Sequence, residues 1–87
     1  MKDSEIIRMG YSIQAYFEKT GEEIAKPKDL MPWLIELGYF NKDHREGLPL
    51  RDVLRRLDNE GKLFYLPNLI PEKKEKNTYW TFIRIVH

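Results

Sequence analysis

The stretch PLRDVLRRLDNEG, residues 49–61, has the most regular hydrophobic spacing in the chain. Its apolar side chains recur three and four residues apart, which is the spacing that lines one face of an α-helix. These side chains are Leu50, Val53, Leu54 and Leu57. Pro49 suits the first turn of a helix, and Gly61 suits the position just past its end. We therefore expect a helix over residues 49–60 with one buried face.

The opposite face of this helix is polar and charged, and it has two interpretations. Its cationic and amide side chains are Arg51, Arg55, Arg56 and Asn59. Arginine and asparagine carry donors that match the edges of guanine and adenine, so the face suits a nucleic acid. Asp52 lies in the middle of the face, and acids three or four residues from the arginines could instead pair with them in a solvated surface. Both interpretations stay open.

Two further helices are expected before this one. Apolar residues at helical spacing predict a helix over residues 4–19. A second is expected over residues 29–37, with Asp29 as its N-cap. A start at Pro27 is the alternative, but it would place Pro32 inside the helix and kink it.

After Gly61 the hydrophobic period changes from helical spacing to alternation. Residues 62–66 and 78–86 are rich in apolar, β-branched and aromatic side chains and are predicted to be strands. The polar residues between them, 67–77, would form the long tip of a β-hairpin. The connection over residues 22–28 could add two or three extended residues. The expected class is α+β, with a three-helix core and a C-terminal two-stranded hairpin.

Length and composition fit one domain over residues 1–87. The chain is 41% hydrophobic and 13% aromatic and has no cysteine, so its core needs no disulfide. Two histidines, His44 and His87, are too few for a zinc site, and we expect neither a metal nor a cofactor. The N-terminus alternates charged and apolar residues, and no stretch approaches the roughly 18 apolar residues that span a bilayer. We therefore expect a cytoplasmic protein without a membrane partner.

No pattern in the chain indicates catalysis. No serine nucleophile has a partnered histidine, and the five glycines lie far apart, so no glycine-rich phosphate loop is present. We expect no catalytic residues and no enzyme activity.

The order helix, short connection, helix, loop, helix and hairpin resembles that of winged-helix (winged helix-turn-helix) domains. The resemblance covers essentially the whole chain. It rests on this order, on residues 50–57 followed by Gly61, and on the hairpin within residues 62–86. It implies that the third helix enters the major groove of double-stranded DNA and that the hairpin, or wing, touches the DNA backbone or the minor groove. The chain is also similar to small uncharacterised bacterial proteins, which implies no activity.

Carried onto this chain, the resemblance implies a DNA-binding surface on the third helix and the wing, with a regulatory role. The candidate DNA-binding residues are Arg51, Arg55, Arg56, Asn59, Lys73, Lys74 and Lys76. The net charge of +1 is the sum of −2 over residues 1–40 and +3 over residues 41–87. The basic bias therefore lies in the second half of the chain, which contains these candidates. Glu72 and Glu75 alternate with the wing lysines. A single module makes few phosphate contacts, so weak binding by the monomer is expected.

A protein-interaction module is the alternative. Leu69 and Ile70 lie between two prolines and would form an apolar patch if they were exposed on the hairpin, or ordinary core if they folded back. The edges of a two-stranded hairpin are also free to pair with another chain. In this interpretation the hairpin mediates homodimerisation or binds a protein partner, and nucleic acid has no role.

Overall fold

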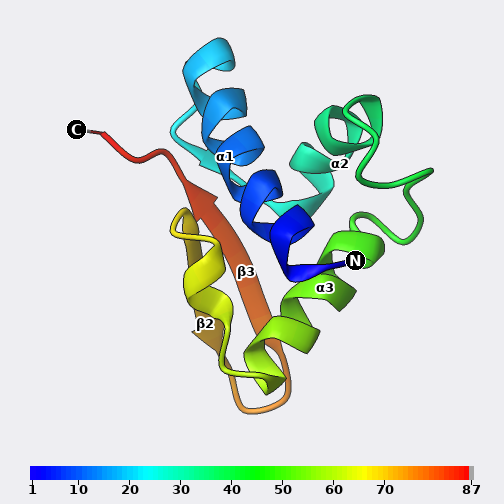
Figure 1. Cartoon of the computed structure of the whole chain (residues 1–87). Helices are drawn as coiled ribbons and strands as arrows, with labels where there is room; N and C mark the ends of the chain where they lie inside the picture. Colours follow the sequence, from blue (N-terminus) through cyan, green and yellow to red (C-terminus); the bar gives the residue numbers. More distant parts are fainter. Residues whose placement is uncertain (87) are drawn as a thin grey trace.

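The computed structural model describes residues 1–86 (Figure 1). In this range the chain forms three α-helices, a 3-10 turn and a three-stranded antiparallel sheet. The elements in chain order are α1 (Asp3–Thr20), β1 (Ile24–Ala25), α2 (Pro27–Glu36), α3 (Leu48–Asn59), η1 (Leu63–Tyr65), β2 (Leu69–Lys73) and β3 (Thr78–Ile83). The predicted α+β class with three helices is confirmed. His87, one of the two histidines considered above, lies outside the described residues.

The sheet has β3 at its centre, in the order β1-β3-β2. β2 and β3 form the C-terminal hairpin, with Leu69 opposite Phe82. β1 pairs with the other edge of β3, where Ile24 lies opposite Ile83. The sheet therefore has one strand more than the predicted hairpin. The extra strand comes from the connection in which a few extended residues were expected.

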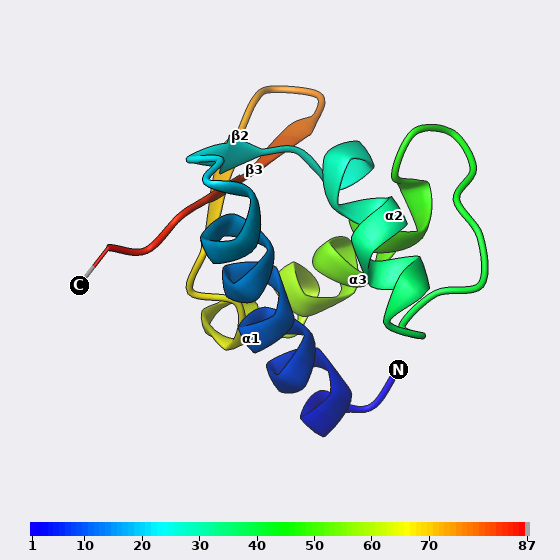
Figure 2. The same ribbon diagram turned by 90° about the horizontal axis from the view of Figure 1, so that it is seen from above.

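The core lies between the three helices and one face of the sheet (Figure 2). Trp80 and Phe82 are two residues apart on β3 and so share a face, and they are 4% and 0% exposed. The helices contribute the buried side chains Ile6, Met9, Ile13, Phe17, Leu30, Met31, Leu34, Leu50, Leu54 and Leu57. Burying an apolar side chain of this size stabilises the fold by about 1.5–3 kcal/mol, so these stripes hold the helices against the sheet.

The predicted start of α2 is wrong by two residues. The helix begins at Pro27, not Asp29, and Pro32 lies inside it. Asp29 still supports the start of the helix, because its Oδ2 accepts a hydrogen bond from the backbone N–H of Lys26 at 2.9 Å. The carboxylate acts from within the first turn, where it also interacts favourably with the helix dipole. Proline at the first helical position costs no hydrogen bond, which allows the earlier start.

The predicted strand over residues 62–66 is also wrong. These residues contain the turn η1, and the first strand of the hairpin is β2, farther along the chain. The backbone N–H of Lys62 donates to the carbonyl of Leu57 at 2.8 Å, which closes the end of α3 and redirects the chain. Residues 62–66 therefore connect α3 to the edge of the sheet. Their alternation of hydrophobic residues reflects partial burial beside α1 and α3.

β3 ends at Ile83, three residues before the predicted limit. Beyond that point, two backbone N–H groups donate hydrogen bonds that hold the chain beside other segments. The N–H of Arg84 donates to the carbonyl of Glu23 at 2.9 Å, and the N–H of Ile85 donates to Oε1 of Gln14 at 3.1 Å. The C-terminal segment therefore remains attached to α1 without continuing the sheet.

Candidate functional site

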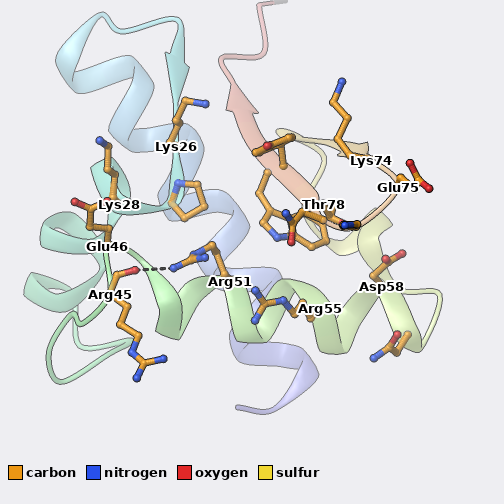
Figure 3. A pocket seen from close by; sticks show the side chains of 16 residues that line it. Lys26, Lys28, Arg45, Glu46, Arg51, Arg55, Asp58, Lys74, Glu75 and Thr78 are labelled. Carbon is orange, nitrogen blue, oxygen red and sulfur yellow. Dashed lines mark hydrogen bonds between the residues drawn. The ribbon is translucent and has the colours of Figure 1, made fainter.

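A groove of about 780 Å³ lies between α3, the start of α2 and the tip of the hairpin (Figure 3). We call it the basic groove. Its lining residues are Lys26, Pro27, Lys28, Arg45, Glu46, Arg51, Arg55, Asp58, Asn59, Lys74, Glu75, Lys76, Asn77, Thr78, Tyr79 and Trp80. They come from three separate segments of the chain, which only the tertiary fold brings together.

The lining of the basic groove is strongly cationic. Seven of its residues are lysine or arginine and three are acids, which gives a net charge of +4 (7 − 3) in a chain whose total is +1. The cations are Lys26, Lys28, Arg45, Arg51, Arg55, Lys74 and Lys76. Acids therefore outnumber cations on the rest of the protein, and the excess positive charge is concentrated in the basic groove. This distribution favours an anionic ligand.

One wall of the groove is the exposed face of α3. Arg51, Arg55 and Asn59 are four residues apart, so they lie on successive turns of the same face. Arg51 donates through Nη2 to the backbone carbonyl of Arg45 at 2.6 Å, as the dashed line in Figure 3 marks. Because a guanidinium has five N–H donors, this bond orients Arg51 and leaves donors for a ligand.

A close approach of two helix starts builds the second wall. Gly47 precedes α3 with φ +92°, and an added Cβ there would lie 2.7 Å from the backbone nitrogen of Lys28. This contact places Lys26 and Lys28, at the start of α2, beside the start of α3. The position requires glycine both for its left-handed backbone and for the lack of space.

The loop before Gly47 has an uncommon backbone. Arg45 and Glu46 both have φ +51°, in the left-handed region that non-glycine residues rarely adopt. Two hydrogen bonds hold the turn: Asp43 Oδ1 accepts from the N–H of Gly47 at 2.8 Å, and the carbonyl of Arg45 accepts from Arg51. Strain of this kind persists only where surrounding contacts fix it, and here it sets Arg45 at the rim of the groove.

The third wall is the tip of the hairpin, where Lys74 and Lys76 lie. The backbone N–H of Lys74 donates to the carbonyl of Asn77 at 2.7 Å and closes the tip. Glu72 forms an ion pair with Lys74, and this hydrogen bond lowers the pKa of the Glu72 carboxyl and raises the pKa of the lysine. Both groups are exposed, so the pair is easily exchanged for another partner.

Trp80 and Tyr79 line the groove between the helical and hairpin walls. Trp80 is 4% exposed, whereas Tyr79 is 53% exposed. The second tryptophan, Trp33, lies elsewhere, and its Nε1–H donates to the carbonyl of Ser12 at 2.8 Å. Trp80 is therefore a natural spectroscopic probe of this groove.

Five of the seven residues predicted to bind DNA line the basic groove: Arg51, Arg55, Asn59, Lys74 and Lys76. The other two lie outside it. Arg56 donates through Nη1 to the carbonyl of Met1 at 3.1 Å, and Lys73 pairs with Asp58 at 3.0 Å. These two cations tie structural elements together across the fold.

The sequence did not identify three cations of the groove: Lys26, Lys28 and Arg45. One local signal was present. Lysines beside a helix N-terminus oppose the helix dipole, so their presence at the start of α2 favours a role other than stability. Nothing local marked Arg45, which reaches the groove through the strained turn.

α3 and its C-cap contain two of the predicted acid pairs, Arg55 with Asp52 and Arg56 with Glu60, the latter at 3.9 Å. Arg55 Nη1 lies 3.0 Å from Asp52 Oδ1, and both side chains are more than half exposed. Such a pair contributes about 0–1 kcal/mol. Arg51 has no acid partner within residues 1–86.

The hairpin offers less apolar surface than the alternative interpretation requires. Leu69 is 7% exposed and belongs to the core, while Ile70 is 47% exposed. Pro71 follows on the outer strand β2 and lacks an N–H, which interrupts the donors that a pairing chain would need. The pair Leu69-Ile70 is therefore split between core and surface.

Among the residues that the structure describes, no group of three histidine, cysteine or acidic side chains could hold a metal ion, and no helix could cross a membrane. Comparison with known proteins adds no relative, because no family model, curated protein or solved structure matches the chain.

Proposed function

We propose that this chain is a winged-helix module that binds double-stranded DNA through the basic groove. The element order, with β1 between α1 and α2 and the hairpin after α3, agrees with the order that the resemblance implies. The proposal is for binding and regulation without catalysis, in keeping with the sequence patterns.

The observation that carries the proposal is the convergence of seven cations from three segments on one groove. Neutralising phosphates and releasing their counterions supplies most of the sequence-independent affinity for DNA. The groove concentrates the charge that this mechanism needs, although the whole chain is nearly neutral.

The shape of α3 also supports duplex DNA as the ligand. The helix has 12 residues and so is about 18 Å long, and with side chains it is about 10–12 Å wide. The major groove of DNA is about 12 Å wide and admits such a helix. In this arrangement Arg51, Arg55 and Asn59 face the DNA, where they reach base edges and the flanking phosphates, and Lys74 and Lys76 contact phosphates from the wing.

Lys26 and Lys28 extend the interface beyond the predicted residues. They lie at the start of α2, near one end of α3, whereas the hairpin tip lies toward the other end of that helix (Figure 3). Cations toward both ends of an inserted helix can reach phosphates that border the major groove. We therefore assign both lysines to phosphate contacts, which position the module without reading sequence.

The test is fluorescence anisotropy of a labelled mixed-sequence duplex at low salt. Lys28→Glu is expected to weaken binding about tenfold, because it removes a phosphate contact and adds a repulsive charge. Arg8→Glu is the matched control, because Arg8 is exposed on α1, is absent from the groove and undergoes the same charge change. Equal losses for the two variants would show that only net charge matters and would refute the assignment.

Trp80 gives an independent readout. In the variant Trp33→Phe, Trp80 is the remaining tryptophan of the chain and lines the basic groove. DNA in the groove is expected to change its emission. A large anisotropy change of the labelled DNA with constant Trp80 emission would place the DNA on another surface.

A further inference from the structure

A second groove, of about 510 Å³, lies between α1, the turn η1 and the segment that follows β3. We call it the apolar groove. Figure 2 shows the 3-10 turn beside α1, and hydrogen bonds between Gln14 and Ile85 hold the C-terminal segment to the same helix. The apolar groove shares no lining residue with the basic groove, and none of its lining residues is charged.

The side-chain amides in this groove already have partners. Asn68 is 2% exposed, and its amide donates to Gln14 Oε1 at 2.7 Å and to the carbonyl of Ile83 at 2.9 Å. The amide of Gln14 donates to the carbonyl of Ile85 at 2.9 Å and to Glu18 Oε1 at 3.1 Å. With these donors used, the groove suits an apolar occupant more than a polar one.

Two large aromatic side chains protrude at the groove. Tyr11 is 77% exposed and Phe64 is 74% exposed. The ring of Phe64 packs edge-on against Tyr65, with 4.9 Å between centroids, and the Tyr65 hydroxyl donates to Asp3 Oδ2 at 3.2 Å. The contact with Tyr65 restricts the protruding ring of Phe64, which lowers the side-chain entropy lost on burial.

We propose that the apolar groove is the self-association surface of this protein and that its occupant is a second copy of the chain. In a two-fold dimer the same patch meets itself, so it must contain both a concavity and the group that fills it. This patch contains both, a groove and the protruding rings of Phe64 and Tyr11.

Charge and area support this occupant. A charge close to a two-fold axis faces the identical charge of the partner, so an uncharged lining is suited to self-association. At about 200 Å² for a fully exposed aromatic residue, Tyr11 and Phe64 expose about 300 Å², and the partly exposed Ile7 brings the apolar total near 400 Å². The apolar share of the smallest stable interfaces is about 350 Å² per partner, so the patch has the area of a small, weak interface.

This inference does not depend on DNA binding, because the two grooves have no residue in common. A dimer formed here leaves both basic grooves open. Two modules on adjacent half-sites would provide the affinity that a single small module lacks.

The experiment is sedimentation equilibrium of the wild-type protein from about 10 µM to about 1 mM, concentrations that detect a weak interface. The wild type is expected to shift from monomer to dimer, and Phe64→Glu is expected to raise the dissociation constant at least tenfold. Ile24→Glu is the matched control, because Ile24 is 62% exposed on β1 and lies outside the apolar groove. The dissociation constant of the Ile24→Glu dimer should equal that of the wild type.

Tyr11→Glu is the second variant, on another element of the same patch, and should also weaken the dimer. Circular dichroism checks that each variant is folded. A wild-type monomer at about 1 mM overturns the proposal, since even a weak interface would associate there. So does a dimer that neither Phe64→Glu nor Tyr11→Glu weakens more than Ile24→Glu does.

Discussion

Replacing Asp52 with asparagine is expected to increase DNA affinity. Asp52 lies 3.0 Å from Arg55 and neutralises one of the seven cations of the basic groove. Without it, Arg55 gains freedom to contact a phosphate. One additional contact changes the slope of log K against log salt by about −0.9, which corresponds to at most about eightfold at 0.1 M salt. We therefore expect Asp52→Asn to bind about three- to eightfold more tightly.

Anisotropy with the same labelled duplex measures this change, and Glu36→Gln is its control. Glu36 is exposed at the end of α2, outside the basic groove, so the control matches the change in net charge. The stability of Asp52→Asn should change by less than about 1 kcal/mol, because the broken ion pair is exposed. If the two variants bind equally, Arg55 does not contact DNA and the reasoning is refuted.

Three further predictions concern the scaffold that forms the two grooves. Gln14→Ala should destabilise the protein by about 1–3 kcal/mol in urea unfolding, because it leaves a donor of the buried Asn68 amide without its partner; no loss would show that this bond is dispensable. Gly47→Ala should lower stability more than Gly21→Ala, because both glycines have positive φ but only Gly47 lies against backbone at the start of α2; equal losses would contradict the close approach. Hydrogen bonding from a lysine lowers the pKa of Asp3, so its contribution to stability is present above its ordinary pKa near 3.8 and is lost as pH falls below it; Asp3→Asn should flatten the acid limb of the stability profile, and an unchanged limb would exclude that contribution.

The helices were predictable because the hydrophobic periodicity agrees locally with the residues that begin and end helices. The predicted helix over residues 49–60 differs from α3 by only one residue at each end. The agreement is close because a single amphipathic stripe marks the helix and two glycines, Gly47 and Gly61, flank it. The start of α2 was not predictable from capping preference alone. Asp29 acts inside the first turn there, and Pro32 is tolerated within the helix.

The strand β2 escaped prediction because its sequence is poor in strand-forming residues. Pro71 and the charged Glu72 and Lys73 read as part of a polar loop. An edge strand tolerates such residues, since proline needs no partner on its outer side and charge discourages pairing with other chains. The alternating residues 62–66 gave the stronger local signal but lie where the chain must turn away from α3.

The candidate site was predictable only where one element carries it. Arg51, Arg55 and Asn59 share a helix face, so their spacing was enough to group them. Lys28 and Arg45 join them through the contact of two helix starts and a left-handed turn, which no local pattern encodes. The second groove likewise depends on α1, η1 and the C-terminal segment meeting in space.

The salt dependence of duplex binding tests the central proposal most directly. Five cations of the basic groove have no acid partner within residues 1–86: Lys26, Lys28, Arg45, Arg51 and Lys76. If three to five of them neutralise phosphates, log K should fall against log salt with a slope between about −2.7 and −4.5 across the range from 50 to 200 mM. Lys28→Glu should make the slope less steep by about one unit. Absence of binding at about 50 mM salt, or a slope near zero, would contradict the account.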